Sequence, residues 1–501
     1  MLNDLVIGFS VSFQYVNLFC CFAGVLIGQV IGILPGIGPV GAMSLLMPIT
    51  YYLQPVSAII MLSGIYYGAQ YGGSVTSILL NIPGEATTVV TCLDGYQMAR
   101  KGRAGIALGI SALGSFIAGT LGICGLVLLA YPLAKFGLRL GAPEYFSLVL
   151  FGITLIIYMA SESMLRALIS AVLGLWVGTI GLDTMTSTPR FSFGSLTLLD
   201  GVGLVPIAMG LFGVSEVLLN IEQSIKRDIY KERIGNLLPT IRDFLSSAGA
   251  IIRGTLIGFF LGIIPGGGAL LASFFSYGLE KRISKHPEKF GKGAIEGVAG
   301  PESANNAGAQ GAFIPLLTLG IPSNVIMAML LGTLMIHGVK PGPLLLSQNP
   351  KLFWGVITSM YVGNIILLIL NIPLIALWVK ILKIPYYILF PLILLFCVIG
   401  VYSLNNNEWE IYILILFGAL GYVLRKLRFE VAPFVLALVL GPLLEENLRQ
   451  SLVLSGGKIS ILFTQPISLI FLLITFFLLS TFAIPKFKKK RRVLIETKDD
   501  L

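Results

Sequence analysis

Two polar segments interrupt long apolar stretches of this chain, and their side chains are of the kinds that bind ions. The first covers residues 66–74 and continues at residues 81–85, and the second covers residues 300–308 and continues at residues 318–324. Both mix glycine with amides, hydroxyls and a carboxylate. Such groups are costly inside a membrane unless they are paired with one another or line a cavity.

These segments supply two sets of candidate ligands. Oxygen atoms of carboxylates, amides and hydroxyls suit a small cation, and amide and hydroxyl donors suit an organic anion. The same side chains can equally satisfy backbone groups at helix breaks, and Glu85 can equally be an acid at a helix N-terminus in an interface. The tentative ligands for a coupling ion, sodium or a proton, are Gln70, Ser74, Asn81, Glu85, Glu302, Ser303 and Thr318, and those for a substrate are Asn305, Asn306 and Ser323.

A proline-glycine turn occurs once in each half of the chain, inside an apolar run. Such a turn joins two half-helices, and its free N–H groups and the positive end of the next helix dipole suit a carboxylate. Glycine is needed there because a β-carbon would keep the ligand away from the backbone. The predicted substrate-binding tips are Pro35, Gly36, Ile37 and Gly38 in the first half and Pro265, Gly266 and Gly267 in the second.

A ladder of glycines at four-residue spacing precedes each turn. The two ladders and their turns share one offset (254 − 24 = 230 and 265 − 35 = 230). Small residues four apart lie on one helix face, so we expect the ladder positions to permit close helix packing rather than to bind substrate. They are Gly24, Gly28 and Gly32, matched by Gly254, Gly258 and Gly262.

The composition indicates an integral membrane protein. Of the 501 residues 56% are hydrophobic and 12% charged, and residues 5–84 contain no Asp, Glu, Lys or Arg. Such runs are long enough to span a bilayer as helices, and they lack the alternation of a β-barrel. The net charge of +10 fits basic cytoplasmic loops rather than nucleic acid binding. The five cysteines and two histidines show no metal or redox spacing.

The chain divides into two related halves. We expect a first membrane repeat at residues 1–220, a cytoplasmic connection at 221–249, a second repeat at 250–485 and a basic cytoplasmic tail at 486–501. Basic residues flank the second ladder segment on both sides, which indicates a re-entrant hairpin that enters from the cytoplasm. The first ladder segment has uncharged flanks and could be the same kind of hairpin entering from outside. Opposite entry sides favour inverted repeats. The predicted fold is therefore all-α, with about 10–12 transmembrane helices in two inverted repeats, each with a re-entrant or broken-helix hairpin.

The long motifs resemble those of the large membrane subunit of tripartite tricarboxylate transporters. The resemblance covers nearly the whole chain from about residue 17, and its motifs occur in order. They are residues 32–39, 67–74 and 81–85 in the first half and residues 265–268, 301–307 and 320–323 in the second.

The resemblance implies a multi-pass permease of the prokaryotic inner membrane. Its expected partners are a small four-span membrane subunit and a periplasmic substrate-binding protein, in addition to the lipid bilayer. The implied activity is secondary, cation-coupled uptake of citrate or another small organic anion, without a cofactor. An anion channel with paired hairpins as its filter is the alternative. The sequence shows no phosphate-binding loop and no catalytic set, which argues against an enzyme.

Overall fold

The computed structural model is built almost wholly of helices, as the composition predicts. It describes residues 2–34, 38–160, 163–183, 185–222, 238–266, 268–381 and 386–483. Within these ranges the strands form one small hairpin, in which Gly181 pairs antiparallel with Arg190. The expectation of an all-α membrane protein is confirmed.

The first half begins with three helices that precede a long buried one. The helices of this half are α1 (Leu2–Ser12), α2 (Tyr15–Ile33), α3 (Gly38–Thr50), α4 (Pro55–Leu80), α5 (Val89–Met98), α6 (Ala104–Gly137), α7 (Ala142–Tyr158), α8 (Met164–Gly178), α9 (Leu204–Ala208) and α10 (Ser215–Glu222), with strands β1 (Gly181–Leu182) and β2 (Pro189–Arg190) between α8 and α9. A 3₁₀ turn (Ala86–Thr88) leads into α5, and π-helical turns (Ala99–Arg103 and Met209–Val214) join α5 to α6 and α9 to α10.

The second half starts at α11. Its helices are α11 (Ile241–Ile263), α12 (Gly268–Ile283), α13 (Glu296–Gly311), α14 (Phe313–Leu319), α15 (Val325–Ile336), α16 (Leu345–Gln348), α17 (Pro350–Asn371), α18 (Ile375–Ile381), α19 (Tyr386–Asn405), α20 (Glu408–Lys426), α21 (Ala432–Leu454), α22 (Ile461–Thr464) and α23 (Pro466–Ala483), with a 3₁₀ turn (Pro287–Lys289) after α12. Helix α11 runs through the expected boundary at residue 250. Residues 223–237 of the expected connection and the tail 486–501 lie outside the described residues.

Several helices are long and apolar enough to cross a membrane. Five qualify by length and composition in the described part of the chain, and seven shorter apolar helices have 10–17 residues. The five long segments are 15–33, 86–137, 204–222, 241–263 and 350–371. Their exposed faces are rich in Leu, Ile, Val and Phe, as lipid contact requires.

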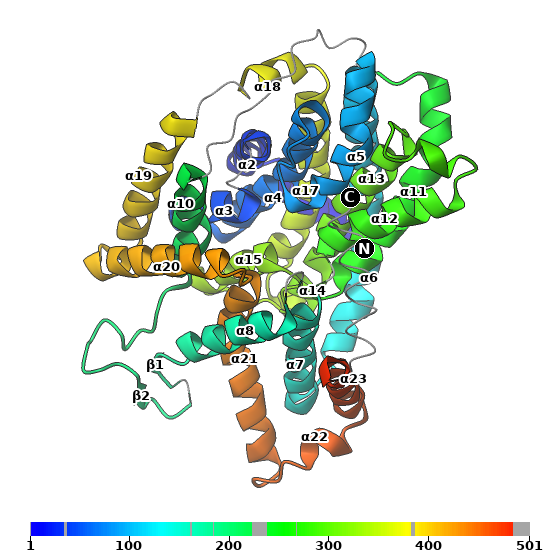
Figure 1. Cartoon of the computed structure of the whole chain (residues 1–501). Coiled ribbons are helices and arrows are strands. Elements are labelled where there is room, and N and C mark those ends of the chain that lie inside the picture. Colours follow the sequence, from blue (N-terminus) through cyan, green and yellow to red (C-terminus); the bar gives the residue numbers. More distant parts are fainter. Residues whose placement is uncertain are drawn as a thin grey trace.

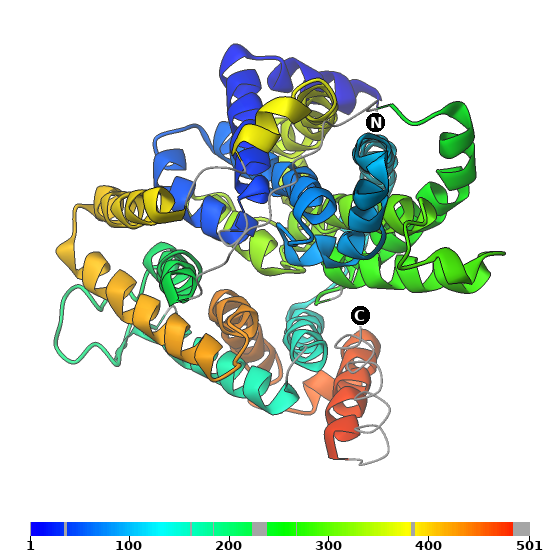
Figure 2. The ribbon, with the colours of Figure 1, turned by 45° about the horizontal axis from the view of Figure 1, so that its top comes forward.

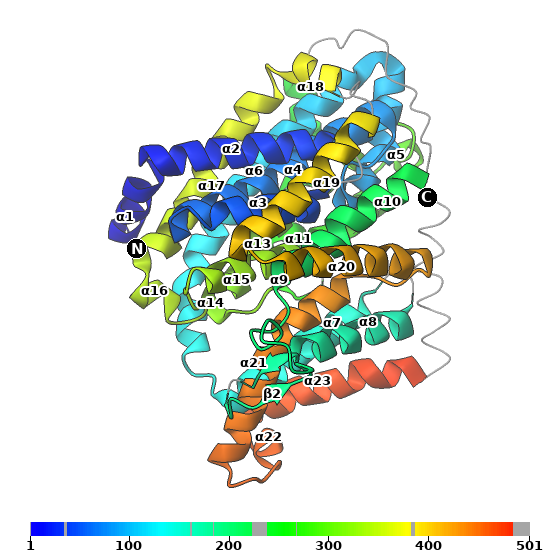
Figure 3. The same ribbon diagram turned by 90° about the vertical axis from the view of Figure 1, so that its left-hand side faces the viewer.

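The helices form two groups that lie side by side (Figures 1 and 2). The core group contains α1–α6 and α11–α18, and the largest cluster of buried apolar side chains fills it. The flanking group contains α7–α10 and α19–α23; Figure 3 shows α7, α8, α21 and α23 of this group below the core helices. Two smaller apolar clusters hold the flanking helices together.

Matching contacts in the two halves build the core group. Helix α2 packs its glycines on the backbone of α4, and α11 packs its glycines on the backbone of α13. A β-carbon at Gly28 would lie 2.4 Å from the Ile65 carbonyl oxygen, and one at Gly258 would lie 2.1 Å from that of Ala304. Because these distances are too short for any β-carbon, the ladders serve close helix packing, as expected.

The helix breaks match as well. Helix α4 ends at Asn81 with φ 56°, and α14 ends at Gly320 with φ 72° (320 − 81 = 239). Both residues are left-handed, a conformation that asparagine and glycine adopt at least cost. The matching contacts and breaks support a duplicated unit, whereas the opposite orientation of the two units in the bilayer stays a prediction.

Candidate functional site

A fully buried carboxylate, that of Glu302 on α13, lies at the centre of a polar cluster in the core group. The Ser74 hydroxyl of α4 donates to its Oε2 at 2.5 Å, and the Thr91 hydroxyl of α5 donates to its Oε1. The Asn305 amide lies at the hydrogen-bond limit, 3.5 Å from Oε2. Since Ser74 and Thr91 belong to the first half, this carboxylate joins the broken-helix segments of both halves.

The cluster continues through the neighbouring asparagine to α6. The Asn306 side-chain amide lies 2.8 Å from the Ser115 hydroxyl oxygen, 2.6 Å from the Asn305 amide oxygen and 3.1 Å from the Glu302 carbonyl oxygen. An amide group has only two hydrogens for these three acceptors. Asn306 therefore links α13 to the Ser115 hydroxyl of α6 and also contacts the neighbouring Asn305.

A second acid, Glu85, lies on the other side of Gln70. The Gln70 side chain donates to Glu85 Oε1 at 3.2 Å and accepts from the Thr87 hydroxyl at 2.7 Å. The other carboxylate oxygen, Oε2, is buried without a hydrogen-bond partner among the described residues. Gln70 and Ser74 are one turn apart on α4, so this helix connects the two acids.

In the described part of the chain, neither acid is neutralised by a basic side chain. Within the described ranges, the ion pairs involve neither Glu85 nor Glu302. By contrast, the buried Glu280 of α12 pairs with Arg253 of α11 at 2.7 Å. A buried carboxylate without such a partner costs several kcal/mol unless it binds a proton or a cation. The cluster is therefore suited chemically to hold a small positive ion.

The structure brings together six of the sequence-predicted ligands and leaves others apart. Gln70, Ser74, Glu85, Glu302, Asn305 and Asn306 form the cluster. Ser303 on the same helix is buried with no hydrogen-bond partner for its hydroxyl in the described part of the chain. Thr318 donates to the Ile314 carbonyl of its own helix, and Asn81 ends α4, so both have local structural roles.

Four hydroxyls of the cluster are absent from the sequence-based candidates. Thr87 and Thr91 are four residues apart, as are Ser111 and Ser115, and the second pair lies in an otherwise apolar run. Thr91 and Ser115 contact Glu302 and Asn306, while Thr87 contacts Gln70. The signal that would have found them is hydroxyl spacing of four, which places both groups on one helix face.

The proline-glycine tips are only partly described. Pro35, Gly36, Ile37 and Gly267 lie outside the described residues. Gly38 has φ 64° and open space where a β-carbon would be. In the second tip, the Gly266 amide donates to the Ser323 carbonyl oxygen at 2.9 Å, so Ser323 holds the tip through its backbone.

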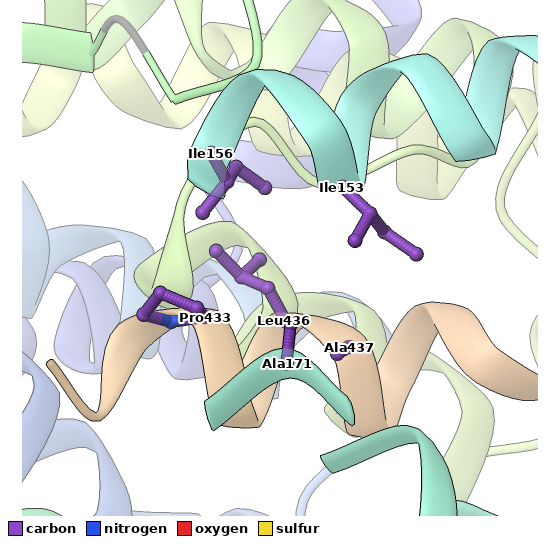
Figure 4. Close-up of a pocket in the computed structure, with 6 residues that line it drawn as sticks. All are labelled: Ile153, Ile156, Ala171, Pro433, Leu436 and Ala437. Atoms are coloured by element: carbon purple, nitrogen blue, oxygen red, sulfur yellow. The ribbon is translucent and has the colours of Figure 1, made fainter. Parts of the chain in front are cut away.

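The second tip also touches the flanking group. Pro265 faces Gly152 of α7, and a β-carbon at Gly266 would lie 3.0 Å from the Ile156 Cα. Beside this contact the apolar side chains of Ile153, Ile156, Ala171, Pro433, Leu436 and Ala437 enclose a narrow gap. Figure 4 shows the two isoleucines of α7 pointing toward α21 across this gap. The gap is lined by apolar side chains alone, whereas the Glu302 cluster holds polar groups from both halves, so we take the cluster as the candidate site.

Comparison with known proteins identifies relatives and a family for this chain. The chain is 50% identical over 497 residues to an uncharacterised 52.8 kDa protein of the TAR-I ttuC' 3' region of Agrobacterium vitis, with 99% of each chain covered. It is 56% identical over 211 residues to an uncharacterised protein of the TAR-II ttuC' 3' region of the same organism, covering 42% of this chain and 87% of that one. No solved structure matches the chain. The model of the tripartite tricarboxylate transporter TctA family matches residues 18–436, and the chain belongs to this family.

Proposed function

We propose that this chain is the large permease subunit of a binding-protein-dependent tripartite transporter. It takes up a tricarboxylate or a related organic anion by secondary, cation-coupled transport. The observation that carries the proposal is the Glu302 cluster, in which buried polar groups from both halves surround a carboxylate without a basic partner. Such intramembrane acids typically mark ion or proton pathways.

The partners follow from the family and the apolar surface. A tripartite system implies further subunits. We propose a small four-span membrane subunit and a periplasmic substrate-binding protein, with all membrane parts in a prokaryotic inner membrane. The helix surfaces facing outward are apolar and can contact either lipid or a second membrane subunit.

The substrate site is proposed near the tips and the asparagines of α13. The Ser303 hydroxyl, which has no partner among the described residues, can donate to a carboxylate. The Asn305 and Asn306 amides are hydrogen-bonded within the cluster, so binding through them requires an exchange of partners. The second tip adds its half-helix N-terminus at α12. In the described conformation the Gly266 amide is occupied by Ser323, so binding through that amide requires the tip to open.

The buried acids disfavour the channel alternative. An anion pore that passed Glu85 and Glu302 would place two like charges beside the permeating anion, which raises its energy. In a transporter, a cation binds to the same acids first and neutralises their charge before the anion binds. The two mechanisms differ in how flux depends on an ion gradient.

Uptake by the reconstituted complex tests the proposal. Both membrane subunits are placed in proteoliposomes, the binding protein is added outside, and radiolabelled citrate and a panel of di- and tricarboxylates are supplied under sodium or proton gradients varied separately. We expect saturable accumulation that needs the binding protein and one ion gradient. Flux that does not saturate and needs neither would instead favour a channel.

A further inference from the structure

The hydrogen bonds around Ser74 depend on whether Glu302 carries a proton. The Ser74 hydroxyl has one hydrogen and two acceptors in range, the Gln70 carbonyl oxygen at 3.1 Å and Glu302 Oε2 at 2.5 Å. With Glu302 ionised, the hydroxyl can serve only one of them well. With Glu302 protonated, the acid donates to Ser74 and Ser74 donates to Gln70, so every group is satisfied.

The spacing of the oxygens favours a proton over a metal cation. A hard cation of calcium size holds oxygen ligands at about 2.3–2.6 Å, and two ligands at a right angle are then roughly 3.4 Å apart. The Ser74 and Glu302 oxygens are much closer than that, at 2.5 Å. This distance fits a hydrogen shared by the two oxygens, so in the described conformation they form a hydrogen bond with each other.

Among the residues that the structure describes, the groups around α13 bring no unpaired positive charge to Glu302. Glu85, Tyr71 and Cys92 of the first half are its titratable neighbours, and the α6 side presents the hydroxyls of Ser111 and Ser115. The other charged and titratable groups packed on α13 are occupied elsewhere: Arg253 pairs with Glu280, and Asp94 accepts from Gly293, Ala294 and Tyr277.

We propose that Glu302, held by Ser74, Thr91 and Asn305, binds and releases the proton that drives uptake. This inference rests on the proposed function and names the coupling ion and its carrier. A hydronium ion on the outer side transfers a proton to Oε2: an O–H bond of hydronium breaks, leaving water, and a new O–H bond cancels the charge of Glu302. On the inner side that O–H bond breaks, the proton passes to a water molecule to form hydronium, and the carboxylate is restored.

The test replaces the acid by its amide in the reconstituted complex. Glu302→Gln keeps the shape and the hydrogen-bonding of a protonated acid but cannot release a proton. The probe is the carboxylate of the panel that wild type takes up fastest. We expect the variant to lose accumulation driven by an inside-alkaline pH gradient, while exchange of internal for external carboxylate without a gradient continues. The matched control is Glu144→Gln, a buried acid that caps the Gly141 amide at 3.0 Å, and it should accumulate the probe like wild type.

A second variant decides the matter if Glu302→Gln does not fold. Thr91→Val removes a donor that stabilises the ionised acid. The pH above which uptake is lost should then move upward, by up to about 1 pH unit. A purely structural role for Thr91 would lower uptake without moving that pH.

The outcomes separate the inference from the proposed function. Accumulation by wild type driven by sodium at constant pH, with no effect of a proton gradient, overturns the inference and leaves the permease intact. Accumulation by Glu302→Gln driven by a pH gradient also overturns the inference. The same holds if the pH above which Thr91→Val loses uptake equals that of wild type. A wild-type complex that transports no carboxylate under any gradient contradicts both proposals.

Discussion

Ser74 and Glu302 lie 228 positions apart in the sequence, and the Ser74 hydroxyl donates a 2.5 Å hydrogen bond to the Glu302 carboxylate. One residue comes from the long helix of the first half, and the other from the matching helix of the second. The bond therefore joins the two halves of the chain. A displacement of α13 relative to α4 that separates the two residues breaks this hydrogen bond. We therefore expect the protonation of Glu302 to depend on the relative position of the two helices.

Gly258→Ala should destabilise the protein, because its β-carbon would lie 2.1 Å from the Ala304 carbonyl oxygen. The backbones of α11 and α13 would have to separate, at a cost of about 1–3 kcal/mol. Gly278→Ala in α12 is the control, since no atom lies within 4 Å of its added carbon. Thermal unfolding of the detergent-purified protein should show a lower midpoint for the first variant alone. Equal midpoints would mean that the ladder is not a tight contact.

Gly266→Ala should impair transport more than an alanine at another left-handed glycine. Its φ is 77°, and its β-carbon would lie 3.0 Å from the Ile156 Cα of α7. Gly338 has φ 70° with open space around it, so Gly338→Ala carries only the backbone strain, about 1–2 kcal/mol. Initial uptake rates at equal protein levels compare the two. If both variants transport alike, the contact between tip and α7 has no role.

The Arg253–Glu280 pair predicts an asymmetry between its two partners. The Glu280 side chain is 3% exposed and that of Arg253 is 43% exposed. Arg253→Gln leaves an unpaired acid in the interior, which costs about 3 kcal/mol or more, whereas Glu280→Gln leaves an arginine that can turn to solvent. We expect a clearly larger fall in unfolding midpoint for Arg253→Gln. The reverse order would contradict the burial of Glu280.

The sequence predicts the breaks and contacts that depend on local residue types. Glycines four apart indicate a helix face that another backbone can approach, and Asn81 and Gly320 suit left-handed helix ends; the structure has both features. Five of the six clustered candidates are amides or acids, which are conspicuous inside apolar runs, and the sixth is Ser74, one turn from Gln70. These signals arise from backbone sterics and from the cost of burying polar groups.

Features that depend on long-range packing were not predictable in the same way. The hydroxyl spacing marks a polar helix face around Thr91 and Ser115, but only the fold shows that this face meets Glu302 and Asn306. The pairing of α8 with α21, where Gly174 meets the Phe434 carbonyl, joins helices from opposite halves. Apolar helix faces do not specify their partners, because the hydrophobic effect is not directional.

Substrate-driven proton movement tests the central claim most directly. Proteoliposomes with the complete complex are mixed, without an imposed gradient, with the carboxylate that wild type transports, and the external pH is recorded with radiolabel exchange measured in parallel. Our account predicts external alkalinisation with wild type and with Glu144→Gln, and none with Glu302→Gln although exchange continues. Alkalinisation by Glu302→Gln equal to that of wild type would contradict the assignment of the coupling proton to this carboxylate.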